Sequence, residues 1–156
     1  MKNHQKTQFT IYGINNTIAI LESKRFTVSK IDIVRNGRAE KDDYLMHLVS
    51  KLTFQPKFYA KPGFFQKYPE GRTQGIAAVI DGRIAKNELP DYSEKKSICL
   101  LALDQIEDPQ NFGQIIRTAE CAGVNGIIIP KHHSAPITDT VLQVSQGAFV
   151  NMPLYE

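Results

Sequence analysis

Cysteine is scarce in this 156-residue chain, which limits the classes of protein it can belong to. Only Cys99 and Cys121 occur, and neither forms a Cys-x-x-Cys pair. Such spacing does not build a disulfide framework or a cysteine zinc site. Because Cys99 falls in a strand pattern and Cys121 in a helix pattern, we expect both to be small buried side chains in a reducing compartment.

Long hydrophobic runs are absent as well. No segment is long and apolar enough to cross a bilayer, and residues 1–10 lack the apolar centre of a signal peptide. The hydrophobic content of 42% is ordinary for a globular protein. We therefore expect a cytoplasmic protein without a membrane partner.

Two kinds of ligand motif are also missing or weak. The chain contains no GxGxxG and no GxxxxGK[ST] sequence, which argues against a nucleotide-binding domain unrelated to RNA. His132 and His133 are the single hint of a metal site. Adjacent histidines chelate poorly, and no cysteine or carboxylate cluster accompanies them, so we expect no metal.

Charge is distributed unevenly along the chain. Residues 1–80 contain 13 Lys and Arg against 6 Asp and Glu, a net charge of +7, whereas residues 81–156 carry −4. A basic first half favours contact with a polyanion, although such imbalance is also common in small domains.

The first half alternates between helix and strand patterns. Apolar spacing predicts helices near residues 14–21 and 42–52 and strands at 28–34, 54–59 and 76–80. This alternation indicates a compact α/β layer fold over residues 9–80. Residues 81–96 are charged and lack an apolar period, so we expect a linker there and a second domain over residues 97–156.

The second half begins with a strand–loop–helix–strand unit. Residues 98–103 and 126–129 are apolar runs of strand length, and the helical pattern between them stops at Gly123. We expect a further helix over residues 138–148 and a last strand over 150–154. The loop after residue 103 lies at the carboxyl end of a strand, where open parallel sheets bind ligands.

The side chains after this loop leave two interpretations open. Asn111 can cap the helix and still present an amide to a ligand. Gly113 lets another backbone or a substrate approach closely, and Arg117 follows less than two turns after Asn111. The alternative is that Asp108 and Asn111 only cap the helix and Arg117 is a solvated helix residue.

The motif Asp108-Pro109-x-Asn111-x-Gly113-x-x-x-Arg117-Thr118-Ala119, followed by Ala122-Gly123, resembles the first motif of the SpoU/TrmH family. These are RNA 2′-O-ribose methyltransferases of the SPOUT superfamily. The downstream order of short motifs also fits this family: Pro130-Lys131, Ser134-Ala135, Ser145-x-Gly147-Ala148 and Pro153-Leu154.

This resemblance implies a role for each motif residue. Arg117 would be the catalytic arginine, Asn111 would line the same site, and Asp108, Pro109, Gly113 and Thr118 would form the structural part of the motif. The implied reaction moves a methyl group from S-adenosylmethionine to a ribose 2′-OH of ribosomal RNA, with a 23S-type guanosine favoured, or of tRNA. Complete relatives are expected to be homodimers.

The first half resembles the small substrate-binding domain, similar to ribosomal protein L30e, that precedes many SpoU/TrmH catalytic domains. The resemblance covers Ile11-Tyr12-Gly13 and Gln74-Gly75-Ile76; Thr73 stands where relatives usually have histidine. The RNA-binding candidates are Arg35, Arg38, Lys61, Arg72 and Gly75, since loops favour phosphate contacts. Phe64, Phe65 and Tyr68 would stack on unpaired bases or form core.

The second and third family motifs have no counterpart in this sequence. The expected fold is therefore an L30e-like α/β/α domain followed by the first part of a SPOUT catalytic domain, truncated before its α/β knot. We expect the S-adenosylmethionine site to be absent and the 156-residue chain alone to be inactive. The alternative function is an RNA-binding module without catalytic activity.

Overall fold

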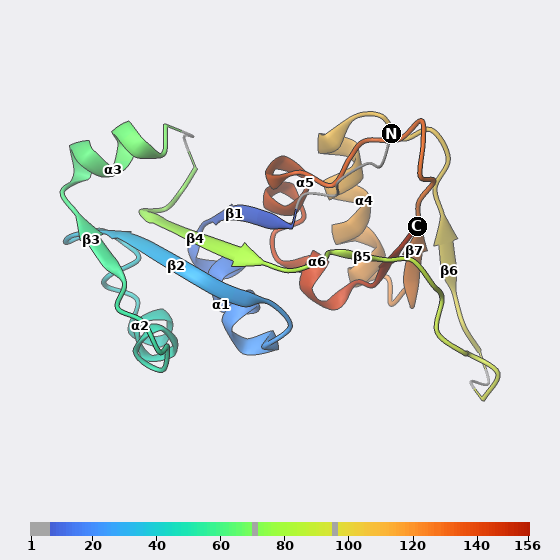
Figure 1. Ribbon diagram of the computed structural model, residues 1–156, viewed down its shortest axis with the longest axis horizontal. Helices are drawn as coiled ribbons and strands as arrows, with labels where there is room; N and C mark the ends of the chain where they lie inside the picture. Colours follow the sequence, from blue (N-terminus) through green and yellow to red (C-terminus); the bar gives the residue numbers. More distant parts are fainter. Residues whose placement is uncertain (1–6, 70–71, 95–96) are drawn as a thin grey trace. The chain divides into compact units, whose positions relative to one another are not determined.

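The computed structural model describes residues 7–69, 72–94 and 97–156. The chain has a mixed α/β fold and divides into two compact units, an N-terminal unit (Gln8–Gly82) and a C-terminal unit that contains Arg83–Glu156 (Figure 1). No helix in these described ranges is long and apolar enough to cross a membrane.

A four-stranded sheet forms the centre of the N-terminal unit. Its strand order is β1 (Gln8–Tyr12), β4 (Ile76–Asp81), β2 (Thr27–Val34) and β3 (Lys57–Tyr59). Strand β4 is antiparallel to β1 and β2, whereas β2 and β3 are parallel. The carboxyl ends of β1, β2 and β3 therefore meet the start of β4 at one end of the sheet.

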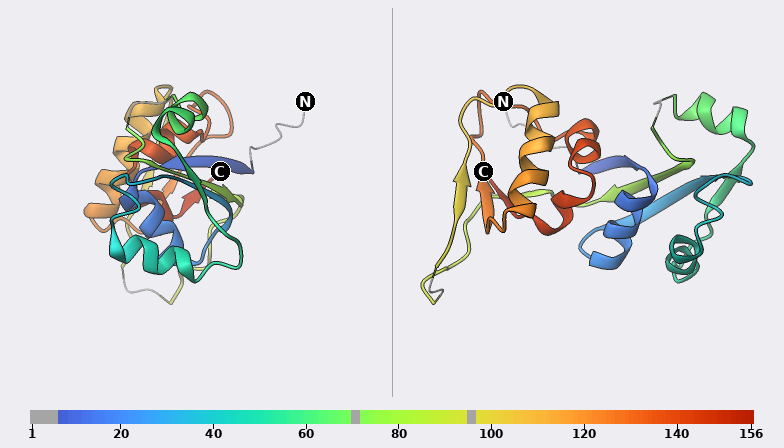
Figure 2. Two further views of the ribbon diagram at one scale, coloured as in Figure 1. Left: turned by 90° about the vertical axis from the view of Figure 1, so that its left-hand side faces the viewer. Right: turned by 180° about the vertical axis from the view of Figure 1, so that it is seen from behind.

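Helices cover both faces of this sheet. Helices α1 (Ile14–Ser23) and α2 (Asp43–Ser50) lie on one face, and α3 (Lys61–Lys67) lies on the other, as Figures 1 and 2 both show. The core on the first face is aliphatic and includes Ile31, Ile33, Leu45 and Ile76. The core under α3 is aromatic and includes Tyr12, Phe64 and Tyr68.

Side-chain caps explain where the first two helices begin. The N–H of Ile14 donates to Oε1 of Gln74 at 2.8 Å, so the glutamine before β4 caps α1 across the fold. Asp42 caps α2 by accepting from the N–H of Leu45 at 2.9 Å. The predicted helices near residues 14–21 and 42–52 are confirmed.

The C-terminal unit contains a parallel sheet of short strands. Their order is β5 (Ala85–Lys86), β8 (Leu154–Tyr155), β7 (Gly126–Ile128) and β6 (Leu100–Ala102). All three pairings are parallel. Strand β6 lies at one edge of this sheet.

Three helices accompany these strands. Helix α4 (Pro109–Cys121) connects β6 to β7 and packs against α5 (Asp139–Val144), and α6 (Ala148–Asn151) precedes β8 (Figure 2). The predicted strand–loop–helix–strand unit is confirmed. The conformation of Gly123 (φ +72°) confirms that a left-handed glycine ends α4.

Several sequence-based expectations are wrong in this unit. The expected linker over 81–96 contains β5, which pairs with β8 and has Ile84 buried beside it; residues 95–96 lie outside the described residues. The helix expected over 138–148 ends at Val144, because the backbone becomes left-handed at Gln146 (φ +51°) and Gly147 (φ +92°). Val150 belongs to α6, so the last strand starts at Leu154.

Both cysteines are exposed rather than buried. Cys99 immediately precedes edge strand β6, and Cys121 is the last residue of α4 on the side away from the core. The apolar periodicity of the sequence correctly predicted the strand and the helix near these cysteines. It did not predict that side chains at the ends of these elements are exposed to solvent. The L30e-like character of the N-terminal unit stays a prediction.

Candidate active site and RNA-contact surface

The start of α4 is fixed by Asp108 rather than by Asn111. Asp108 is the N-cap residue, and its carboxylate accepts from the N–H of Gln110 at 2.9 Å. Pro109 occupies the first helical turn, where its missing N–H costs nothing. Asn111 therefore lies inside the helix, and the prediction that it caps α4 is wrong. Its exposed amide is left for another partner.

Gly113 is required by helix packing. A Cβ atom at this position would lie 2.6 Å from Cβ of Val144 and 2.8 Å from the carbonyl oxygen of Val141. The close approach predicted for this glycine thus comes from α5 and not from an open substrate channel. Because Gly113 has no side chain, α4 and α5 can pack closely, and this contact sets the position of α4.

A pocket of about 610 Å³ lies beside α4 and β6. Asn111 and Thr118 both line it, because seven residues bring helix positions back to the same face. Gln114 is the other polar residue of the lining. The remaining lining residues are apolar: Leu101, Ile106, Ile115, Ala119, Ala122 and Val124.

Arg117 lies outside this pocket. It is exposed, and within the described ranges its guanidinium has no ion pair or hydrogen bond. Six helical residues separate Arg117 from Asn111 by about 9 Å along the axis and about 120° around it. The structure therefore brings Asn111 and Thr118 together but points Arg117 along a different face of α4.

The predicted RNA-binding residues gather at one end of the N-terminal sheet. The N–H of Arg35 donates to the carbonyl of Tyr59 at 2.8 Å, which joins the loop after β2 to the end of β3, just before Lys61. The N–H of Val34 donates to the carbonyl of Gly75 at 2.9 Å, which joins the same loop to the start of β4.

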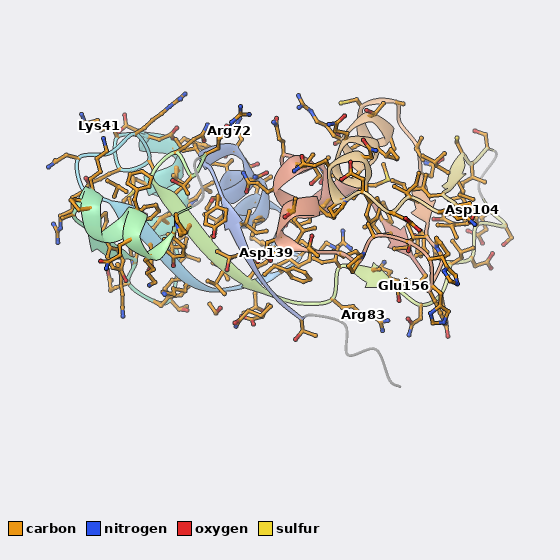
Figure 3. The ribbon with its side chains drawn as sticks, turned by 90° about the horizontal axis from the view of Figure 1, so that it is seen from above. Lys41, Arg72, Arg83, Asp104, Asp139 and Glu156 are labelled. Atoms are coloured by element: carbon orange, nitrogen blue, oxygen red, sulfur yellow. The ribbon has the colours of Figure 1, made fainter. Side chains whose placement is uncertain are left out.

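The four cationic side chains at this end are exposed: Arg35, Arg38, Lys61 and Arg72. Figure 3 labels Arg72 and Lys41 at separate positions on the N-terminal unit. We call these four the cationic rim. Gly75, in contrast, is buried with φ +80°, so its contribution there is a backbone turn.

Sequence reasoning missed a buried ionic cluster next to this rim. Asp32 on β2 has a side chain with no exposed area, and it accepts from the ammonium of Lys67 at 2.6 Å and from the hydroxyl of Tyr68 at 2.7 Å. Lys30 lies 3.2 Å from the same oxygen. The sequence offered one signal for this cluster: in an alternating strand, Asp32 lies on the same face as Lys30 and Val34.

This cluster shifts the pKa of Asp32, Lys67 and Tyr68. Burial raises the pKa of the Asp32 carboxyl, but hydrogen bonds from Lys67, Tyr68 and Lys30 outweigh it, so the pKa lies below its usual value. The hydrogen bond to Asp32 raises the pKa of Lys67. Burial, followed by the contact with Asp32, raises the pKa of Tyr68. Asp32 is thus an anion that fastens α3 to the sheet.

The aromatic candidates separate into core and surface. Phe64 is fully buried and Tyr68 is 7% exposed, so both are core residues, whereas Phe65 is 37% exposed. His132 and His133 are also exposed. Over the ranges that the structure covers, no three metal-binding side chains form a cluster.

Comparison with known proteins connects this geometry to a protein class. Residues 99–156 match the SpoU rRNA Methylase family. The chain is 36% identical over 152 residues to the 23S rRNA (guanosine-2′-O-)-methyltransferase RlmB of Vibrio vulnificus, covering 92% of this chain and 60% of that protein. It is 30% identical over 151 residues to an uncharacterized tRNA/rRNA methyltransferase of Mycoplasma pneumoniae, covering 94% and 60%.

Solved structures agree with these relatives. An AdoMet-bound rRNA methyltransferase from Sinorhizobium meliloti superposes with a TM-score of 0.74 at 18% identity, covering 96% of this chain and 54% of that one. The SpoU methyltransferase AviRb from Streptomyces viridochromogenes, also with AdoMet, gives 0.70 at 20% identity, covering 95% and 53%. The fold is therefore of the SpoU methyltransferase class.

Residues 99–156 thus match the SpoU family, and the chain is similar over most of its length to methyltransferases of this kind. It spans 60% of the length of the two relatives named above.

The pocket beside α4 does not fit S-adenosylmethionine by itself. This methyl donor carries a carboxylate, an ammonium group and a sulfonium cation, whereas the pocket lining contains no charged side chain. Buried or half-buried charges need a partner of opposite sign.

Proposed function

We propose that this chain functions in RNA methylation, as part of an enzyme that methylates a ribose 2′-OH with S-adenosylmethionine as donor. Ribosomal RNA, with a 23S-type guanosine favoured, is the proposed substrate, and tRNA is the second choice. One observation carries the proposal: the family motif on α4 presents an exposed guanidinium, Arg117, that no described acidic side chain neutralises.

Arg117 would act on the charge of the substrate. A guanidinium stays protonated at neutral pH, so it is a poor base. Held beside the 2′-OH and its phosphate, it would stabilise the negative charge that develops on the ribose oxygen as its proton leaves. Asn111, one turn into α4, would orient the nucleotide through its amide.

The N-terminal unit would hold the RNA. The cationic rim places four positive side chains at one end of the sheet, where loops can approach a phosphate backbone. The donor would be bound by the second and third family motifs, which have no counterpart in residues 97–156. We also propose that the complete enzyme is a homodimer located in the cytoplasm.

The test is a chimera in which Glu156 is followed by the remaining C-terminal part of the V. vulnificus relative. We expect it to transfer labelled methyl groups to ribosomal RNA and to leave a phosphodiester bond resistant to alkaline hydrolysis, as a 2′-O-methyl group does. A methyl group on a base, or no transfer by a chimera that binds both RNA and donor, would contradict the proposal.

A second candidate function is an RNA-binding module without catalysis, and the uncharged pocket lining favours it for the 156 residues alone. In that case the chain binds RNA in a salt-sensitive way and transfers no methyl group. Four phosphate contacts predict an affinity loss of roughly a hundredfold between 50 and 200 mM salt. A gel-shift titration over this salt range measures it.

A further inference from the structure

Helix α3 exposes one aromatic ring beside the cationic rim. Phe65 is 37% exposed, although its neighbours Phe64 and Tyr68 are buried. The other large hydrophobic side chain exposed in the described N-terminal unit, Tyr44, has a polar partner, because its hydroxyl donates to Glu22 at 2.6 Å. Phe65 has no polar atom, so its ring can be covered by an apolar group, another aromatic ring or a cation over its π face.

The ring is held on a rigid mount. A seven-residue helix is not stable by itself, but the bonds from Lys67 and Tyr68 to Asp32 fasten the end of α3 to the sheet. The rings of Phe64 and Phe65 lie 5.5 Å apart at 84°, an edge-to-face contact. A ligand that meets this ring therefore orders little of the protein, which lowers the entropic cost of binding.

A cation stands next to the ring on the same helix face. Lys61 precedes Phe65 by four residues, and side chains at this spacing are neighbours on a helix. Arg35 does not take part in this contact, because its guanidinium lies over the ring of Phe58, 5.6 Å from the centroid, and Phe58 packs with the α1/α2 core.

We propose that α3 stacks an unpaired base of the RNA on Phe65 while Lys61 contacts an adjacent phosphate. The combination of an open aromatic ring and a neighbouring cation matches a single-stranded nucleotide, whose base has a π face and whose backbone is anionic. This inference rests on the proposed RNA function. It adds a preference for loops and bulges over continuous duplex.

The test compares two RNAs of equal length, a hairpin with 2-aminopurine in its loop and a fully paired duplex. Each is titrated with the 156-residue chain and with the variants Phe65→Leu, Phe65→Tyr and Gln66→Ala. Stacking on an aromatic ring is worth about 1–3 kcal/mol per base, so we expect Phe65→Leu to weaken hairpin binding by about tenfold. It should also abolish the change in 2-aminopurine fluorescence.

The other variants serve as controls. Phe65→Tyr keeps an aromatic ring and should retain hairpin affinity. Gln66→Ala alters an exposed neighbour on α3 and should leave the affinity for both RNAs unchanged. Duplex binding should be the same for all four proteins. Thermal melting followed by circular dichroism should show that Phe65→Leu leaves the fold intact.

Three results would overturn the inference. Unchanged hairpin affinity in Phe65→Leu would exclude base stacking on Phe65, whereas RNA binding by the cationic rim would still stand. Equal weakening of hairpin and duplex binding would show that Phe65 acts on RNA binding in general and not by stacking on an unpaired base. Failure of the unsubstituted chain to bind either RNA would overturn this inference together with the proposed RNA function.

Discussion

Asp32 links charge to the stability of the N-terminal unit at the scale of one residue. Its folded-state pKa lies below the unfolded value of about 3.9, so the stability from its ionised form is complete at neutral pH. That contribution is lost as the pH falls below about 4 and the carboxylate takes up a proton. The same side chain receives bonds from Lys67 and Tyr68, so its charge also holds α3.

The substitution Asp32→Asn should lower the unfolding free energy at pH 7 by about 1–3 kcal/mol, because charged hydrogen bonds inside the sheet are lost. The difference from the unsubstituted protein should shrink between pH 4 and pH 3. Urea unfolding followed by circular dichroism measures both values, and Asp43→Asn, an exposed carboxylate on α2, is the control. An equal difference at pH 7 and pH 3 would contradict this account.

The sequence predicted individual residues unevenly. The motif was sufficient to select Asn111 and Arg117, and both are exposed on α4. Their six-residue spacing implies an angle of about 120° between them on a helix, but it does not show which of the two side chains faces the pocket. Asp32 was missed because its partner Lys67 is 35 residues away, which local patterns do not reveal.

At the scale of elements, the packing of α4 on α5 depends on Gly113. Replacing it with alanine places a Cβ atom 2.6 Å from Cβ of Val144, so one helix must move. We expect Gly113→Ala to destabilise the C-terminal unit by about 1–3 kcal/mol, as overpacked cores do. Peptide-resolved hydrogen exchange should show faster exchange across α4.

A matched glycine exists in α3. An added Cβ at Gly63 meets nothing, so Gly63→Ala should raise stability by about 0.4–1 kcal/mol through a less flexible unfolded chain. Slower exchange in α3 would be the observable. If both alanine substitutions had the same sign, close packing at Gly113 would not be the cause.

The elements that the sequence predicted are those with a strong local signal. The sequence of β2 predicts a strand, although its register against β4 shifts between Val28 and Lys30, and α2 starts at the capping residue Asp42. Helix α3 was not predicted, because Pro62 and Gly63 interrupt its period and its stability comes from contacts with β2. Strand β5 has two residues, and only pairing with β8 makes it a strand.

At the scale of the whole molecule, the two units carry opposite charge and different proposed tasks. The basic half contains the cationic rim, and the acidic half contains the family motif. The chain spans 60% of the length of the two methyltransferases to which it is similar. RNA contact and methyl transfer are thus properties that can be measured separately.

The 156-residue chain should bind S-adenosylmethionine too weakly to detect at micromolar concentration. The reason is the lining of the pocket beside α4, which offers no charge to the donor's carboxylate and ammonium groups. Isothermal titration calorimetry tests this directly, with the full-length V. vulnificus relative as the positive control. A micromolar dissociation constant for the chain would contradict the expectation.

The proposed role of Arg117, to make a ribose hydroxyl reactive, can be tested by the rate of methyl transfer itself. The rate of 2′-O-methyl transfer is compared between the chimera and its Arg117→Ala variant, with Gln110→Ala as the control on the same exposed part of α4. We predict a loss of at least about a hundredfold for Arg117→Ala, with RNA and donor binding retained. Undiminished transfer by Arg117→Ala would contradict the account.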